Sequence, residues 1–166
     1  MDLKELRLEL ERIVKRCTEA EQQNSELMHL CVASSRLHES LDRQEVLRAI
    51  QEIVINLVGS EELAVFELNK EGTAFELVDS FGIEPNRYQK IPVAEGQPQL
   101  GNELPLTACI PLMLGEKTVG AVAVWRLLPH KPGLLRVDHD LLALLKNQAG
   151  VALYCTRVLQ KTEAQP

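Results

Sequence analysis

Apolar side chains recur at alternating intervals of three and four residues along residues 3–41, a stretch without Gly or Pro. This heptad pattern predicts a long helix that pairs with another helix in a coiled coil. With Leu3 as the first a position, the predicted seam consists of Leu3, Leu6, Leu10, Ile13, Cys17, Ala20, Asn24, Leu27 and Cys31, and the pattern ends at Ser34, His38 and Leu41. We therefore expect residues 1–40 to form an N-terminal dimerisation helix.

Asn24 indicates how two such helices pair. A buried Asn at an a position pairs best with its own copy in a parallel two-stranded coil, and this pairing fixes the register. The flanking charges agree, because Arg16 would face Glu21 of a second chain in a parallel pair. These features predict a parallel homodimer. The alternative is a helical hairpin within one chain, without a dimer.

Two further segments have helical patterns. Residues 43–58 place Val46, Ile50, Ile53 and Leu57 on one face, and Asp42 is expected to cap this helix. Residues 139–160 carry two apolar stripes, and Asp138 is the expected cap. One stripe is expected to cover a sheet, while the other joins the first helix in a four-helix cluster of the dimer. This adds Leu145, Ala152 and Cys155 to the predicted seam.

The most apolar stretch, residues 107–126, is too interrupted for a membrane-spanning helix, because Gly115-Glu116-Lys117 divides it in two. Its β-branched residues and Pro111 favour two strands, 107–114 and 117–126, joined by a tight turn. A second hairpin is predicted over residues 62–81, around Glu71-Gly72. The chain is therefore expected to have an α+β fold with an antiparallel sheet flanked by helices.

Composition narrows the classes of function. The 166 residues carry a net charge of −6 without a dense basic run, which argues against nucleic-acid binding and against an anionic membrane surface. The first residues, MDLKELRLELERIVKR, are too charged for a signal peptide, and no membrane insertion is expected. The four cysteines lie far apart without a CxxC pair, as is typical of reduced thiols in the cytoplasm.

Three segments resemble the GAF family of sensory and regulatory domains. They are LTACIPLMLGEKTVGAVAVW, DHDLLALLKNQAGVAL and EELAVFELNKEGTAFELVDSFG, which are similar to the family's central hairpin, closing helix and first hairpin. The resemblance covers about residues 36–160. It implies a GAF-like domain over 41–162, followed by a tail at 163–166, in which a sheet lies between a dimerisation layer and a ligand-pocket layer.

Residues 81–105 depart from the GAF pattern. GAF pockets that hold small ligands are closed by a partly helical segment, whereas four prolines and three glycines interrupt this stretch, which can hardly form a stable helix. We expect a shallow or filled pocket and no cofactor. The candidate surface for a ligand or a partner consists of Phe81, Tyr88, Cys109 and Trp125.

No catalytic or metal-binding set is predicted. A thiol reductase like some GAF relatives would need a resolving thiol near Cys109, and residues 81–105 contain no cysteine. His130 and His139 fit no common metal-ligand spacing. The leading hypothesis is therefore a non-catalytic, dimeric interaction module of bacterial cytoplasmic signalling with a protein partner. The alternatives are a small-molecule sensor with an open pocket and, more remotely, a thiol-based reductase.

Overall fold

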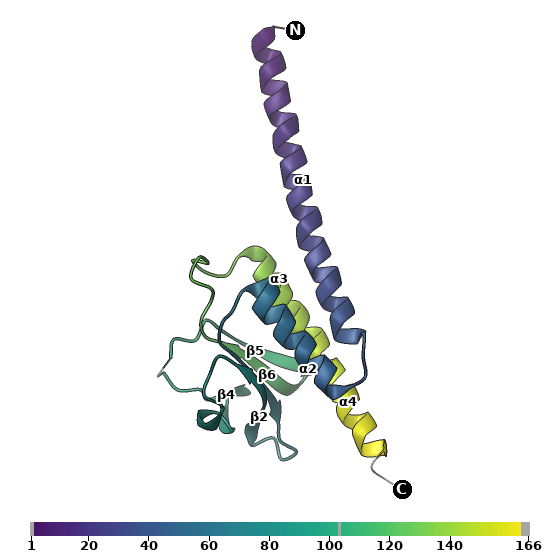
Figure 1. Cartoon of the computed structure of the whole chain (residues 1–166), viewed down its shortest axis with the longest axis vertical. Helices are drawn as coiled ribbons and strands as arrows, with labels where there is room; N and C mark the ends of the chain where they lie inside the picture. Colours follow the sequence, from purple (N-terminus) through teal and green to yellow (C-terminus); the bar gives the residue numbers. More distant parts are fainter. Residues whose placement is uncertain (1, 103, 164–166) are drawn as a thin grey trace.

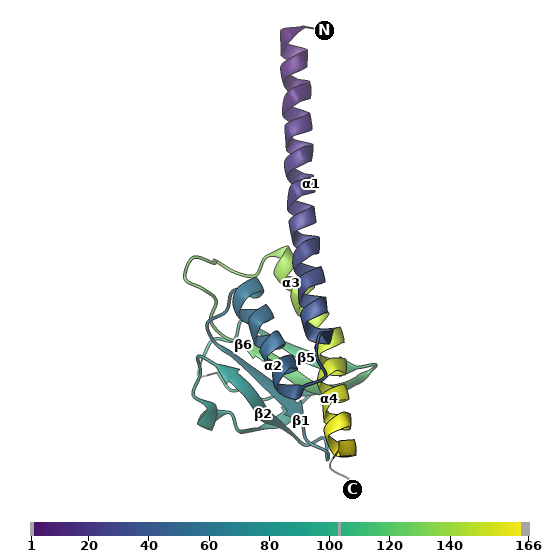
Figure 2. The same ribbon diagram turned by 45° about the vertical axis from the view of Figure 1, so that its right-hand side comes forward.

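The structure is a computed structural model that describes residues 2–102 and 104–163. A long N-terminal helix, α1 (Leu3–His38), stands on a body in which helices cover one face of a six-stranded sheet (Figure 1). Helix α1 begins at one end of the molecule and the C-terminal helix ends at the other (Figure 2). The expected α+β fold, an antiparallel sheet flanked by helices behind a long N-terminal helix, is confirmed.

Helix α1 is continuous over its 36 residues but ends before the heptad pattern does. Leu41, a predicted d position, lies beyond the helix and is exposed. After the helix the chain turns, and two polar side chains accept backbone hydrogen bonds at the start of the next helix. The Ser40 hydroxyl accepts the Asp42 N–H at 3.0 Å, and the Asp42 carboxylate accepts the Glu45 N–H at 3.0 Å. The predicted cap at Asp42 is confirmed. The boundary predicted at residue 40 falls in this loop.

The second helix follows the predicted range 43–58 in two parts. Helix α2 (Arg43–Glu52) continues into a π-helical segment, η1 (Ile53–Val58), which ends at Gly59. Gly59 has φ +81°, a left-handed conformation that costs Gly little and commonly ends helices.

The last helical run also has a π-helical segment in its middle. Its parts are α3 (Arg136–Leu144), η3 (Leu145–Ala149) and α4 (Gly150–Glu163). The prediction of Asp138 as N-cap is wrong, because the helix begins at Arg136. Asp138 is the third helical residue, and its buried carboxylate reaches back to the Leu135 N–H at 2.6 Å and to Lys131 at 2.7 Å. The predicted tail at 163–166 lies outside the described residues, apart from the backbone of Glu163.

The sheet has the order β4-β3-β2-β1-β6-β5, and all its paired strands are antiparallel. Both predicted hairpins are confirmed. The first consists of β1 (Leu63–Leu68) and β2 (Ala74–Phe81), and the second consists of β5 (Ala108–Leu114) and β6 (Lys117–Val124). Strands β1 and β6 pair in the centre of the sheet, which places β5 at an edge.

Residues 81–105 form no α-helix in the part that the structure describes, as expected. They contain a short 3₁₀ turn, η2 (Pro85–Arg87), and two strands that the sequence analysis missed, β3 (Lys90–Ala94) and β4 (Gln97–Pro98). Strand β3 pairs with β2 through Ile91 opposite Phe75. This strand was not predicted because prolines usually interrupt regular structure, although Pro92 lies within the strand.

The two faces of the sheet have different cores. Alternation along β1 directs Leu63 and Val65 to the helical layer, and directs Ala64 and Phe66 to the opposite face. The helical side is aliphatic and includes Leu37 of α1, so the end of the long helix belongs to the core of the body. The opposite side has its own cluster, made of Ala64, Phe66, Phe75, Tyr88, Ile91, Ala121, Ala123 and Trp125.

Candidate functional site

The predicted seam on α1 is an exposed apolar stripe in this single chain. Leu3 is 83% exposed, Leu10 61% and Leu27 59%, and a continuous row of exposed apolar side chains is typical of an interaction site. The remaining α1 residues of the seam are exposed as well: Leu6, Ile13, Cys17, Ala20, Asn24 and Cys31. No described residue of the chain covers the predicted a and d positions before residue 32.

The C-terminal part of α1 is attached to the body through a different face of the helix. Ala33 and Leu37 are fully buried in the aliphatic core, and they occupy c and g positions of the heptad. Beside them the Ser34 hydroxyl donates to the Gln148 side-chain carbonyl at 2.8 Å. Arg36 forms an ion pair with Glu52 of α2 at 2.7 Å. The a and d edge of α1 therefore stays exposed before residue 32, whereas the last turns of the helix contact the body.

The three predicted seam residues of the C-terminal run divide between two environments. Leu145 is fully buried and Ala152 is 6% exposed, both within the aliphatic core under the sheet. We correct their placement in the seam, because they have almost no surface left for a second chain. Cys155 is exposed on α4, next to the exposed apolar side chains of Tyr154, Val158 and Leu159. The error arose because two apolar stripes of similar spacing share this helix.

Two of the four candidate surface residues fill the interior of the domain. Tyr88 and Trp125 are 6% and 3% exposed, and their ring centroids lie 5.1 Å apart. Trp125 has almost no surface left for a ligand, which corrects the prediction for this residue, whereas the small exposed part of Tyr88 lines an open cavity. Together with Phe66 and Phe75 the two rings occupy the space between the sheet and residues 81–105. This open cavity of about 420 Å³ borders the cluster, because Tyr88 and Ile91 line it together with Arg87 and Gln99.

Phe81 and Cys109 lie elsewhere. Phe81 is 46% exposed at the end of β2, and its role in binding a ligand or a partner stays a prediction. Cys109 is half-buried on the edge strand β5, and burial raises the pKa of its thiol from the ordinary 9.0 to about 11. A thiol with this pKa is almost wholly protonated near pH 7, which is the opposite of what a nucleophilic cysteine requires.

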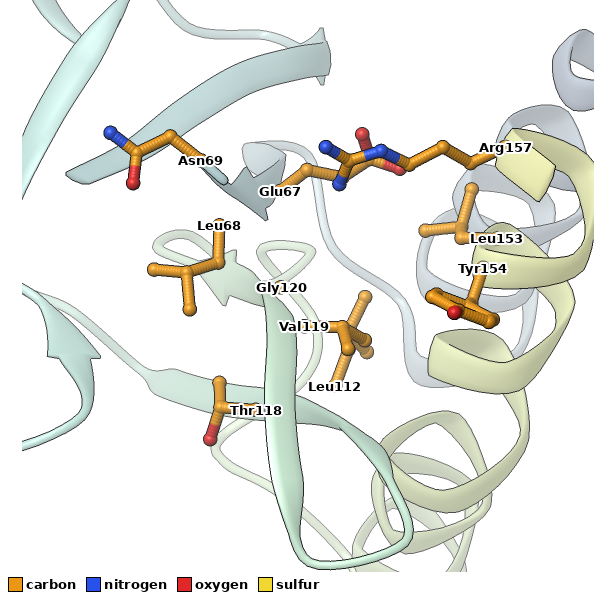
Figure 3. Close-up of a pocket in the computed structure, with 10 residues that line it drawn as sticks. All are labelled: Glu67, Leu68, Asn69, Leu112, Thr118, Val119, Gly120, Leu153, Tyr154 and Arg157. Atoms are coloured by element: carbon orange, nitrogen blue, oxygen red, sulfur yellow. The ribbon is translucent and has the colours of Figure 1, made fainter. Parts of the chain in front are cut away.

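A second cavity, of about 160 Å³, lies between the ends of β1 and β6 and helix α4 (Figure 3). It is on the helical side of the sheet, away from residues 81–105. Its lining is Glu67, Leu68, Asn69, Leu112, Thr118, Val119, Gly120, Leu153, Tyr154 and Arg157. This site was not predicted from the sequence, although one signal was present: alternation along β1 places the carboxylate of Glu67 on the same face as Leu63 and Val65.

Glu67 is held by a half-buried ion pair at the mouth of this cavity. Arg43, the first residue of α2, donates to both carboxylate oxygens of Glu67 at 2.7 and 2.8 Å. The two side chains are 17% and 15% exposed, so their contact is shielded from solvent more than any surface pair. This bidentate contact ties the start of α2 to the end of β1.

Within residues 2–102 and 104–163, no group of three or more His, Cys, Asp or Glu side chains is arranged to hold a metal ion. In the same part of the chain, no helix is long and apolar enough to cross a membrane.

No protein-family model matches the sequence, and no curated protein matches it. Solved structures do resemble it. The GAF domain of a proposed sensor histidine kinase from Pseudomonas syringae pv. tomato aligns over 91% of this chain and 99% of its own, with 16% identity and a TM-score of 0.65. The GAF domain of an Acinetobacter phosphoenolpyruvate-protein phosphotransferase aligns over 82% and 98%, with 13% identity and a TM-score of 0.63.

A third similar structure comprises residues 122 to 287 of a methyl-accepting chemotaxis protein. It aligns over 77% of this chain and 98% of its own, with 20% identity and a TM-score of 0.56. At such identities the likeness concerns the fold alone. The sheet order and the helical layer on one face agree with these solved structures, and the chain therefore has the fold of the two GAF domains among them.

Proposed function

We propose that this chain is a non-catalytic, dimeric GAF-like module of bacterial cytoplasmic signalling, which acts through contacts with a second copy and with a protein partner. The observation that supports it most is the uncovered seam of α1, where large apolar side chains such as Leu10 and Ile13 are more than half exposed. A stripe of this length in water favours association, because each buried Leu or Ile contributes about 1.5–3 kcal/mol.

The attachment of α1 to the body provides a mechanism by which a change in the dimer can reach the rest of the domain. Leu37 is anchored in the core, and Arg36 and Ser34 connect α1 to α2 and η3. A change in how two α1 helices pair would therefore be transmitted to the helical layer and from there to the sheet. The similar structures come from a chemotaxis protein, a phosphotransferase and a proposed sensor kinase, which supports a signalling role.

Sedimentation equilibrium of the full chain and of the variant Leu10→Glu/Ile13→Glu tests the dimer. We expect the wild type to have twice the 18.6 kDa mass of one chain at micromolar concentration. The double variant should dissociate at least about a hundredfold more readily, because it replaces apolar seam contacts by charges. Leu8→Glu is the matched control, since Leu8 is 58% exposed on the same helix but lies at an f position. A monomeric wild type, or equal weakening by Leu8→Glu, would contradict the proposal.

A small-molecule sensor is the second candidate function, and the cavity of about 420 Å³ beside residues 81–105 favours it. Its polar lining includes Arg87 and Gln99. Thermal-shift measurements with a library of nucleotides and metabolites test this candidate. Stabilisation that disappears in Gln99→Ala would support a sensor, whereas no shift with any compound would remove it.

A further inference from the structure

The cavity of about 160 Å³ beside α4 combines an apolar interior with a charged mouth. Leu112, Val119 and Leu153 line its interior, and Leu112 and Leu153 are buried parts of the core. A dry apolar cavity of about 150 Å³ is large enough to bind a single aromatic ring. The interior therefore suits a compact apolar group about the size of one ring.

The charges at the mouth do not balance. Both carboxylate oxygens of Glu67 accept from Arg43, so the negative charge of Glu67 is already matched. Arg157 of α4 extends over the cavity on the side of Glu67 (Figure 3). In the described part of the chain Arg157 has no ion pair or hydrogen bond, although it is half-buried. These three side chains together carry one surplus positive charge.

We propose that this cavity binds a small monocarboxylate with a compact apolar body, such as a benzoate-sized acid. The apolar body lies against Val119 and Leu153, while the carboxylate accepts hydrogen bonds from the guanidinium of Arg157. Tyr154 also lines the cavity, and its side chain carries a hydroxyl donor. The ligand would link α4 to the ends of β1 and β6, on the face opposite to the cavity beside residues 81–105. The site lies within one chain and does not depend on dimerisation.

Titration calorimetry of the full chain with sodium benzoate, and with benzyl alcohol as a neutral compound of similar shape, tests the assignment. We expect benzoate to bind at least about tenfold more tightly than benzyl alcohol, because charge-assisted hydrogen bonds are the stronger kind. Arg157→Gln should remove this preference. Arg136→Gln is the matched control, because Arg136 is an exposed arginine of the same helical run and lies outside the cavity. It should bind benzoate as the wild type does.

Val119→Phe fills the cavity and should abolish the binding of both compounds, with the fold checked by circular dichroism. Backbone NMR shifts locate the site even if this variant fails to fold. Benzoate-induced changes at residues 67–69, 118–120 and 153–157 support the proposal. Changes confined to residues 87–101, equal binding of benzoate and benzyl alcohol, unchanged binding by Arg157→Gln, or no binding to the wild type would each overturn it.

Discussion

The two ends of α1 have the same secondary structure but opposite surroundings. Between Leu3 and Leu27 the helix extends away from the body with its apolar stripe exposed, whereas at Ala33 and Leu37 it is fully buried (Figure 1). The two ends also use different edges. The exposed stripe lies at a and d positions, while Ala33 and Leu37 occupy c and g positions.

This contrast shows that two edges of the same helix have different roles, one in folding and one in association. The c and g edge near residue 37 is buried in the core of the same chain, where it stabilises the folded body. Before residue 32 no described residue of the chain covers the a and d edge, so its apolar side chains contribute to stability only when a second molecule covers them. Substitutions on the first edge should therefore change the stability of the fold, and those on the second should change association.

The largest expected effect comes from truncating the buried edge. Leu37→Ala should lower the free energy of unfolding of the body by about 3 kcal/mol, because it removes a fully buried side chain and leaves a cavity. Urea unfolding followed by the fluorescence of Trp125, the only tryptophan, measures this. Leu10→Ala, measured at a concentration where the chain is monomeric, should change it by less than about 0.5 kcal/mol. Equal losses would remove the distinction between the two ends.

Cysteine reactivity distinguishes burial within one chain, as at Cys109, from burial by a second chain, as predicted at Cys17. The pKa of about 11 at Cys109 leaves about a hundredfold less thiolate at pH 8 than the ordinary value of 9.0 does, because raising the pKa favours the protonated thiol. Alkylation by iodoacetamide at pH 8, read by mass spectrometry, should therefore be about a hundredfold slower at Cys109 in native protein than in urea. This protection should be independent of protein concentration and should fall as the pH approaches 11.

Cys17 should show the opposite dependence. It is exposed in a single chain, so only a second chain at its a position can protect it. Its protection should rise with protein concentration as the dimer forms. Concentration-independent reactivity at Cys17 would contradict the predicted seam.

The ion pair between Arg43 and Glu67 gives a smaller expected effect. Glu67→Gln should destabilise the body by about 2 kcal/mol, because it leaves a half-buried guanidinium without its matched carboxylate. Glu39→Gln, which removes the exposed partner of Arg36, should cost less than about 0.5 kcal/mol. Thermal or urea unfolding of both variants measures the difference. A larger loss for Glu39→Gln would show that burial does not set the strength of these pairs.

The hydrogen bond from Ser34 to Gln148 gives the smallest effect. Ser34→Ala should lower the free energy of unfolding by about 1 kcal/mol, because it leaves one side-chain contact between α1 and η3 unmade. Ser35→Ala is the matched control, since Ser35 is exposed on the adjacent position of the same helix. Urea unfolding of both variants should show a loss only for Ser34→Ala.

The sequence predicted the elements whose signals are local. The two hairpins follow from Gly72 and Gly115 between apolar runs, and the cap at Asp42 follows from its position before an amphipathic segment. Strand β3 was missed because Pro92 suggested irregular structure. The position of Asp138 in α3 was not predicted, because a carboxylate can accept a backbone N–H at the start of a helix from the third helical residue as well as from the N-cap.

The candidate site was harder to predict because it depends on contacts between distant residues. Arg43, Glu67 and Arg157 come together only after the sheet and the helices have packed, and their spacing in the sequence forms no motif. Tyr88 and Trp125 were expected on a surface, since an aromatic residue at a strand end or in a loop suits a ligand or a core equally well. Only the packing against each other places both in the core.

The central claim, a parallel and in-register pairing of α1, is tested most directly by cross-linking a chain that retains Cys17 alone, with Cys31, Cys109 and Cys155 replaced by Ser. A short thiol-to-thiol cross-linker should convert most of this protein to covalent dimers at micromolar concentration, because the two copies of Cys17 would lie opposite each other. Adding Leu10→Glu/Ile13→Glu should prevent it. Cross-linking that fails in the first chain, or that persists in the second, would contradict the account.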